Sequence, residues 1–223
     1  MTTSRRSLLA AGATGTLALT AGCLDFALGN APLEFTARRA APSDATLEGT
    51  GYVEDEVEEQ SFEETVEVAG LEREVRAGIW TSVYTKDRDF EGQTHEASVF
   101  AAVSVPGMEV AGYSVNPLDG LSNEELLEEF LEQLEGGEGE DGFALEDLEH
   151  DETFQLPILG EGRDVDAFVG ETEFQGRTVD VDVVVSSFLH DDDLLVVLGS
   201  YPEPFAEESA NVEVLMESLE HPI

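Results

Sequence analysis

Hydrophobic and polar residues alternate along much of the chain after residue 60. Residues 61–68 and 71–86 both follow a period of two, and a turn-forming Ala-Gly pair lies between them. In a strand, such a period places successive side chains on opposite faces of the sheet. The pattern therefore predicts a β-hairpin whose second strand carries Trp80 and Tyr84 together on one face.

A second hairpin is predicted in the C-terminal half. Residues 152–159 and 165–174 precede a Gln-Gly pair, and residues 177–189, which alternate valine with polar residues, follow it. Two further segments, 97–105 and 194–202, are hydrophobic at most positions, which is typical of strands buried on both faces. We therefore expect both of these segments to lie in the centre of the sheet.

Two segments follow helical spacing instead. Ser122 and Glu125 form the capping-box pattern that begins a helix, and a stripe of leucines with one phenylalanine follows them. A second helix is predicted from about residue 207 to 220, with hydrophobic residues spaced to face the sheet. Between the predicted elements, the acidic and glycine-rich residues 136–142 indicate a solvated loop.

The order of these elements predicts the fold class. Each half of the chain contains a hairpin, a further strand and then a helix, and an internal duplication would explain this order. The strands outnumber the helices and are joined as hairpins. The sequence therefore predicts a single α+β domain over residues 33–223, a mostly antiparallel sheet with two main helices packed on one face.

The first 23 residues differ from the rest because they contain no acidic residue. Arg5 and Arg6 precede an apolar run from Leu8 to Leu24, which at 17 residues is shorter than the ~20 needed to span a bilayer. Basic residues, a short apolar run and small residues before a cleavage site are typical of a signal peptide. The paired arginines resemble a twin-arginine export signal, which predicts a removable signal over residues 1–22.

Cys23 is the only cysteine, so no disulfide within the chain is possible. Its position after Ala21-Gly22 resembles the lipid-attachment site of a lipoprotein, although Thr20 stands where that pattern has an aliphatic residue. We therefore expect lipid on Cys23 and a short tether over residues 23–32, which makes the membrane a partner. An uncleaved membrane anchor and release into the medium remain as alternatives.

Charge sets the chain apart from ordinary soluble domains. It has 50 acidic and 10 basic residues, and Lys86 is the only lysine. Removal of residues 1–22 takes away two basic residues and no acidic one, which leaves 50 against eight and a net charge of −42. At ~1 M salt the Debye length is about 3 Å, so brine screens most of this repulsion. We interpret the surface as haloadapted and expect no nucleic-acid partner, because such a partner requires a basic face.

Candidate chemistry is sparse, and we expect no catalytic residue and no cofactor. The densest set of potential metal ligands is His190, Asp191, Asp192 and Asp193, but aspartates also favour turns and are abundant throughout. Trp80 and Tyr84 are candidates for a ligand groove, with burial against a helix as the alternative.

Aspartates also occur in pairs spaced two residues apart in the second predicted hairpin. Asp164 and Asp166 precede its turn, and Asp180 and Asp182 follow it. With the turn at residues 175–176 the two pairs do not oppose each other, so we interpret them as a solvated face and not as a catalytic pair.

With its signal, its cysteine and the stretches "GYSVNP" and "VVLGSYP", the whole chain resembles uncharacterised secreted lipoproteins of halophilic archaea. This resemblance implies a location on the extracellular face of the cell membrane and no catalytic residues to transfer. The hypothesis is a lipid-anchored, non-catalytic binding or envelope-associated protein. The alternative is an extracellular hydrolase whose site is not visible in the sequence.

Overall fold

The computed structural model describes residues 32–68, 71–90, 92–110, 113–135, 146–174 and 177–223. Arg5, Arg6, Cys23 and the acidic loop 136–142 lie outside the described residues. Within the described part of the chain, no helix has the length and hydrophobicity needed to cross a membrane.

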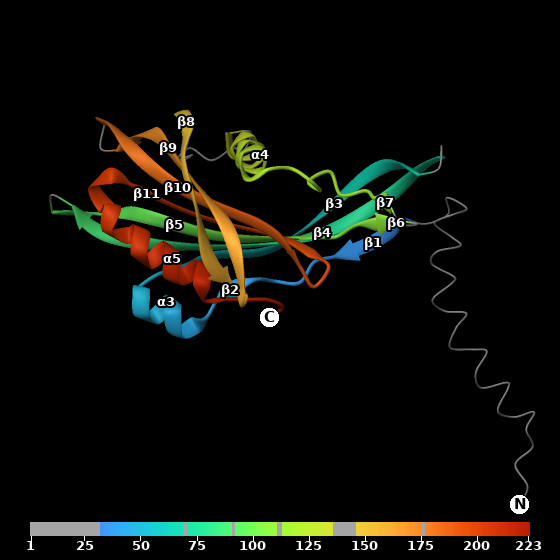
Figure 1. Ribbon diagram of the computed structural model, residues 1–223, viewed down its shortest axis with the longest axis horizontal. Coiled ribbons are helices and arrows are strands. Elements are labelled where there is room, and N and C mark those ends of the chain that lie inside the picture. Colours follow the sequence, from blue (N-terminus) through green and yellow to red (C-terminus); the bar gives the residue numbers. More distant parts are fainter. Residues whose placement is uncertain (1–31, 69–70, 91, 111–112, 136–145, 175–176) are drawn as a thin grey trace, which may run out of the picture.

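One eight-stranded sheet dominates the molecule (Figure 1). Its strands are β1 (Leu33–Thr36), β3 (Val53–Val68), β4 (Leu71–Phe90), β5 (Gln93–Pro106), β8 (Glu146–Ile158), β9 (Glu161–Phe174), β10 (Arg177–His190) and β11 (Asp193–Pro202). The order is β3, β4, β5, β11, β10, β9, β8, and the short β1 lies beside the first half of β4. Only β1 pairs in parallel with its neighbour, so among the described strands the sheet is mixed but largely antiparallel.

The remaining elements are short. Two small sheets are formed by β2 (Ala41–Pro42) with β12 (Leu219–Glu220) and by β6 (Glu109–Val110) with β7 (Tyr113–Ser114). Among the described residues, the helices are α3 (Asp44–Thr50), α4 (Asn123–Glu135), α5 (Ser209–Glu217) and the 3-10 helix η1 (Glu203–Glu208).

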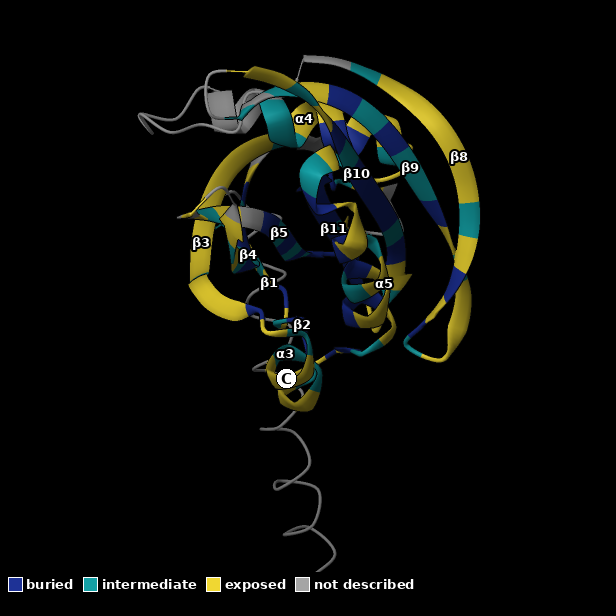
Figure 2. Cartoon of the chain, turned by 90° about the vertical axis from the view of Figure 1, so that its left-hand side faces the viewer, coloured by how far each residue is buried: buried dark blue, intermediate teal, exposed yellow. Residues whose placement is uncertain are grey.

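Both predicted hairpins are present. The β3–β4 pair closes at Val68 and Leu71, and the β9–β10 pair closes at Phe174 and Arg177. The two hydrophobic segments form β5 and β11, which pair with each other at the centre of the sheet. Figure 2 shows β10 and β11 largely buried, whereas the edge strands β3 and β8 are largely exposed.

The predicted α+β architecture is wrong, because the protein is mostly β and its helices form no layer. Six of the eight strands have 13 to 20 residues, far more than the usual 5–6. The longest helix in the described part of the chain, α4, has 13 residues, and the predicted C-terminal helix is divided into η1 and a nine-residue α5. Polar edge strands such as β3 show too little hydrophobic periodicity for the sequence to reveal their length.

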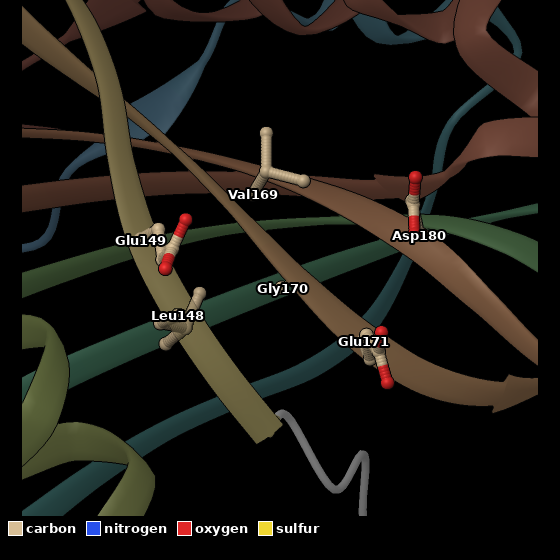
Figure 3. A pocket seen from close by; sticks show the side chains of 6 residues that line it. All are labelled: Leu148, Glu149, Val169, Gly170, Glu171 and Asp180. Atoms are coloured by element: carbon tan, nitrogen blue, oxygen red, sulfur yellow. The ribbon is translucent and has the colours of Figure 1, made fainter.

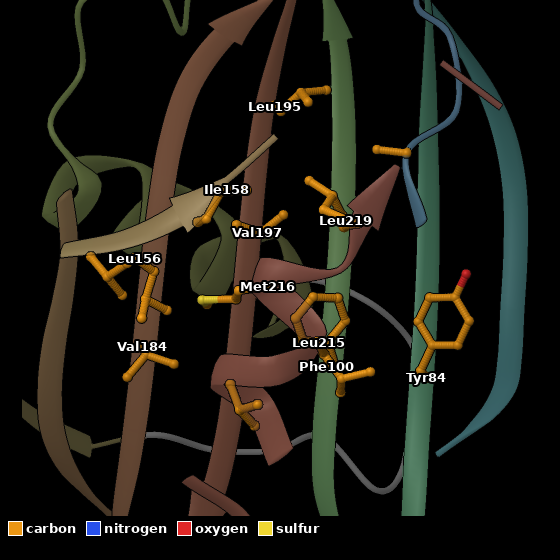
Figure 4. Packing of buried hydrophobic residues seen from close by; sticks show 14 of the residues in the cluster. Tyr84, Phe100, Leu156, Ile158, Val184, Leu195, Val197, Leu215, Met216 and Leu219 are labelled. Carbon is orange, nitrogen blue, oxygen red and sulfur yellow. The ribbon is translucent and has the colours of Figure 1, made fainter. Parts of the chain in front are cut away.

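The helices also pack on opposite faces of the sheet (Figure 1), which corrects the prediction of a single covered face. On one face, Val184 and Val197 pack with Leu215 and Met216 of α5 (Figure 4). On the other face, a second cluster forms around α4 and consists of Val105, Leu126, Leu127, Phe168, Val181, Val183, Val185, Leu194 and Val196. Alternate residues of β10 and β11 thus pack into the cores on opposite faces of the sheet. This is why these strands are hydrophobic throughout.

This placement also removes the support for a duplicated unit. If the two halves were repeats, a two-fold axis perpendicular to the sheet would relate the antiparallel neighbours β5 and β11. Rotation about such an axis does not exchange the two faces of the sheet. A helix repeated by that axis would stay on the same face. Because α4 and α5 lie on opposite faces, the hairpin-strand-helix order does not describe a structural repeat.

One end of the sheet separates into two hairpins. The β9–β10 register ends at Asp166 and Val185. Beyond this point β9 continues to pair with β8, and β10 continues to pair with β11, up to the tips of both hairpins. Figure 1 shows the two hairpins diverging. The candidate functional site lies in the gap between them.

Candidate ligand-binding groove

The aromatic pair predicted to form a groove lies largely inside the protein. Tyr84 is 1% exposed, packs against Phe100 and accepts a hydrogen bond from Arg39 Nη2 at 3.0 Å. Trp80 is half-buried. Neither side chain lines either of the two hollows described below.

The four residues considered as metal ligands belong to two different structural features, a turn and a contact with the C-terminal segment. Asp191 and Asp192 are exposed and have φ values of 51° and 70°, the conformation of a tight type I′ hairpin turn. Asp193 is buried and accepts a hydrogen bond from the backbone N–H of Arg38 at 3.0 Å. In the part of the chain that the structure describes, no three His, Cys, Asp or Glu side chains are grouped to hold a metal ion.

His190 and Asp193 instead hold the C-terminus. His221 Nδ1 lies 2.9 Å from His190 Nδ1, and its Nε2 lies 3.2 Å from Asp193 Oδ2. Burial lowers the pKa of His221, and the nearby carboxylate opposes this effect only in part. A neutral His221 therefore links β12 to the turn between β10 and β11.

A groove of about 480 Å³ lies where the two hairpins diverge, between the start of α4 and strands β8, β9 and β10. Its lining residues are Leu121, Ser122, Asn123, Thr153, Gly162, Arg163, Asp164, Asp166, Ser187 and Phe188. Its volume falls in the range of roughly 300–1,000 Å³ that is usual for small-molecule sites.

The groove lies in the gap between β9 and β10, not on one face of the sheet. Arg163 and Asp164 are neighbours along β9, and Ser187 and Phe188 are neighbours along β10, yet all four line it. Because neighbouring side chains of a strand project to opposite faces, both faces border the groove. In this gap the hydroxyl of Ser186 donates a hydrogen bond to the carbonyl of Asp164 at 2.8 Å, in a stretch beyond the end of the β9–β10 ladder.

Asn123, the first residue of α4, connects the two diverging strands. Its Nδ2 donates to Asp166 Oδ2 on β9 at 2.8 Å, and its Oδ1 accepts from Ser187 Oγ on β10 at 2.6 Å. The predicted capping box fixes the position of Asn123, since Ser122 N and Oγ both donate to Glu125 Oε2 at 2.8 and 2.9 Å. The local sequence thus begins the helix at the point where its first side chain joins both strands.

Asp166 is the centre of the hydrogen-bond network. Thr153 Oγ1 on β8 donates to Asp166 Oδ1 at 2.5 Å, and His150 Nε2 lies 3.5 Å from the same oxygen. Partial burial alone would raise the pKa of Asp166. The hydrogen bonds from Thr153, Asn123 and His150 outweigh burial and hold this pKa below its ordinary value. The carboxylate is therefore ionised at neutral pH.

The hydroxyl groups of the groove are held by acceptors that do not activate them. Ser187 donates to an amide oxygen, and Thr153 donates to the Asp166 carboxylate. His150 Nε2 lies 3.1 Å from Thr153 Oγ1, whose proton is already committed to Asp166, so the imidazole acts as the donor in this contact. A nucleophile requires a base that accepts its proton; the amide oxygen of Asn123 is not a base, and Asp166 is a weak one because its pKa is held below the ordinary value.

Arg163 provides the positive charge of the groove. Its guanidinium carbon lies 4.5 Å from the centre of the Phe188 ring, and its Nη2 lies 2.5 Å from Glu161 Oε2. The Nε–H is buried and has no acceptor among the described residues. Since buried donors in proteins are nearly always paired, this unpaired group is a candidate donor to a bound ligand.

A second hollow, of about 500 Å³, lies nearer the other end of β9 (Figure 3). It is lined by Leu148, Glu149, Val169, Gly170, Glu171 and Asp180. Its polar side chains are all carboxylates, so no lining side chain donates a hydrogen bond to a ligand. The groove between β9 and β10 offers both donors and acceptors and is the better candidate.

Sequence reasoning missed most of this site. It correctly located the start of α4 at Ser122 and Glu125, and it correctly found that the two aspartate pairs do not face each other. It assigned Asp166 to a solvated face, whereas three side chains contact its carboxylate. Asn123 and Ser187 are 64 residues apart in the chain, and no spacing rule connects them.

The fold and the groove define a mostly β protein with one mixed sheet, a short helix on each face, and a polar site between two diverging strands. Residues 39–220 match the family described as "Domain of unknown function (DUF6517)", and the chain belongs to this family. The expectation of an uncharacterised family is thereby confirmed. The matched region contains every residue that lines the groove.

Two other comparisons add little. A comparison with curated proteins gives no match. Among solved structures, the Pseudomonas aeruginosa protein of unknown function PA94 is similar over 70% of this chain and 94% of its own, with 9% sequence identity and a TM-score of 0.35. A likeness at this level carries no argument about function.

Proposed function

We propose that this protein is a non-catalytic binding protein, held by lipid on the extracellular face of the membrane of a halophile, and that it binds a small polar ligand between β9 and β10. One observation carries the binding part of this proposal. Side chains from α4, β8, β9 and β10 converge on a groove that contains ordered acceptors and a buried guanidinium N–H without an acceptor.

Two features of the sequence support the location and habitat. Arg5 and Arg6 followed by a short apolar run favour export, and Cys23 favours a lipid anchor. The excess of 50 acidic over 10 basic residues favours a salt-rich environment.

An extracellular hydrolase, the alternative, receives no support from the groove. Hydrolysis by a serine or threonine requires the hydroxyl to donate its proton to a base. Ser187 donates to the amide oxygen of Asn123, which is not a base, and Thr153 donates to Asp166, whose lowered pKa makes it a weak base. This arrangement favours binding over catalysis.

Filling the groove tests the binding function. A Cβ on Gly162 would meet only the flexible end of Gln155 at 3.9 Å, so Gly162→Leu adds bulk at the groove without a backbone clash. Nuclear magnetic resonance titrations in about 2 M KCl with glycerol, glucose and L-serine as probes should shift the signals of Asn123, Thr153 and Ser187 in the parent protein. The same probes should shift them much less in Gly162→Leu.

The matched control is Glu171→Leu, which adds a leucine beside the second hollow and should leave the shifts unchanged. Shifts of equal size in Gly162→Leu, or shifts confined to residues outside the groove, would show that this groove is not the binding site.

Replacement of Cys23 tests the anchor. If lipid on Cys23 holds the protein at the membrane, Cys23→Ser should move it from the membrane fraction to the soluble fraction, because serine does not provide the thiol to which the lipid is attached. The distribution can be measured by fractionation in high salt. Continued tight membrane association of the variant would favour the uncleaved anchor instead.

A further inference from the structure

We infer that the ligand of this groove is a small zwitterion, a free amino acid or a molecule with the same pair of charges. This inference rests on the proposed binding function and specifies its ligand class. It follows from two properties of the groove that act together: an unused cationic donor and an excess of carboxylates around it.

The unused donor is Arg163 Nε–H. The ring of Phe188 and the carboxylate of Glu161 hold the guanidinium in place from two directions. The Nε atom is nevertheless buried, with no acceptor in the described part of the chain. An ionised donor forms its strongest hydrogen bonds with carboxylate oxygens. The geometry therefore favours a ligand that presents a carboxylate to Arg163.

The surroundings oppose a simple anion. Glu161 pairs with Arg163 on one face of β9, and Asp164 and Asp166 project from the other face and line the groove, so one guanidinium is accompanied by three carboxylates. Asp166 is ionised, because its hydrogen bonds hold its pKa below the ordinary value. Salt screens distant charges, but groups within about 3 Å of each other still interact at ~1 M salt. An anionic ligand would therefore meet repulsion that only a positive charge on the same ligand can offset.

The acidic side of the groove has capacity for that positive charge. Asp164 Oδ1 accepts one hydrogen bond, from Gln155 Nε2 at 2.9 Å, and Asp164 is exposed at the groove. A carboxylate has two oxygens and accepts about four hydrogen bonds. An ammonium group near Asp164, with a carboxylate toward Arg163, uses both sides of the groove.

Calorimetric titration of the full chain in detergent, at about 2 M KCl, tests this ligand class. The probes are L-serine as the zwitterion, its methyl ester as the cation, N-acetyl-L-serine as the anion, and glycerol as the neutral compound. We expect L-serine to bind about tenfold or more tightly than each of the other three, because each of them lacks at least one of the two charges that the groove complements.

Two variants assign the effect to Arg163. Arg163→Gln should remove the preference for L-serine over its methyl ester, because the carboxylate loses its cationic partner. Arg177→Gln changes the net charge equally at an exposed position on the other end of β10 and should keep the preference. Circular dichroism of both variants establishes that they are folded before binding is compared.

The outcomes separate the two proposals. If glycerol or the methyl ester binds as tightly as L-serine and shifts the groove signals, the zwitterion is wrong and the binding groove stands. If none of the four compounds binds and the groove signals do not move, both proposals are wrong.

Discussion

Glu208 is a fully buried carboxylate next to the only lysine of the chain. Its Oε2 accepts hydrogen bonds from Lys86 Nζ at 2.8 Å and from Asn211 Nδ2 at 2.7 Å, and its Oε1 accepts from Arg88 Nε at 2.8 Å. Burial would raise the pKa of Glu208, but the hydrogen bonds from Lys86, Asn211 and Arg88 outweigh it and lower this pKa. The residue therefore stays charged and ties η1 and α5 to β4.

Removal of this charge should strongly destabilise the fold. Glu208→Gln leaves Lys86, whose side chain is 11% exposed, without its counter-charge, and breaking a buried pair costs about 3–5 kcal/mol. Urea unfolding in about 2 M KCl measures the change, since urea is uncharged and leaves the salt constant.

Glu207 provides the control at the neighbouring position. Its side chain is 63% exposed and lies 3.9 Å from Arg88 Nη2. Glu207→Gln should change the free energy of unfolding by less than about 0.5 kcal/mol. Equal effects of the two substitutions would mean that the buried cluster contributes no more than a surface pair.

At the scale of elements, the contact between α5 and β11 depends on a glycine. A Cβ atom on Gly199 would lie 2.1 Å from Val212 Cγ1 of α5. Because Val212 is fully buried, it has no room to move aside. Gly199→Ala should therefore displace α5 and destabilise the protein by about 1–3 kcal/mol, measured by thermal or urea unfolding.

The corresponding glycine-to-alanine substitution in α3 should stabilise the protein instead. A Cβ on Gly49 meets nothing within 4 Å, and alanine favours a helix over glycine by about 0.5–1 kcal/mol. Gly49→Ala should raise the free energy of unfolding by roughly that amount. If Gly199→Ala also leaves the free energy of unfolding unchanged or raises it, α5 does not pack on β11 as closely as described.

The elements differ in how well the sequence predicted them. The β3–β4 and β9–β10 hairpins and the start of α4 were predicted because alternation, turn residues and a capping box act over a few neighbouring residues. Helix α3 was missed: it has seven residues and none of them is fully buried, so it has no hydrophobic stripe to detect. Ser43 Oγ caps the helix by accepting a hydrogen bond from Thr46 N at 3.3 Å, and this N-cap residue is its local signal in the sequence.

At the scale of the whole molecule, negative charge covers the surface and the edges of the sheet. Eight of the 16 residues of edge strand β3 are acidic, and the described side chains of this strand are largely exposed. Charged edge strands resist pairing with the edges of other molecules. In dilute buffer the same charges repel each other across the protein and favour its expansion.

Salt should therefore control folding. When the salt concentration falls from about 2 M to 0.1 M, the Debye length rises to about 10 Å, and the mature chain with its net charge of −42 loses most of its screening. We expect the β signal in circular dichroism to be lost and to return when KCl is added again. A spectrum that stays the same at 0.1 M would contradict haloadaptation.

The sequence alone determined the properties that depend on composition or on near neighbours in the chain. These are the acidic surface, the turns of the hairpins, the central position of β5 and β11, and the first turn of α4. Its predictions for Arg5, Arg6 and Cys23 concern residues outside the described part of the chain and stay predictions.

Tertiary structure alone decided which face each helix covers and where β9 leaves β10. It also brought Asn123, Asp166 and Ser187 into one network and left Arg163 Nε without an acceptor. These features arise where segments far apart in the chain meet. Their energies depend on packing, burial and the divergence of long strands, and a pattern of neighbouring residues does not contain that information.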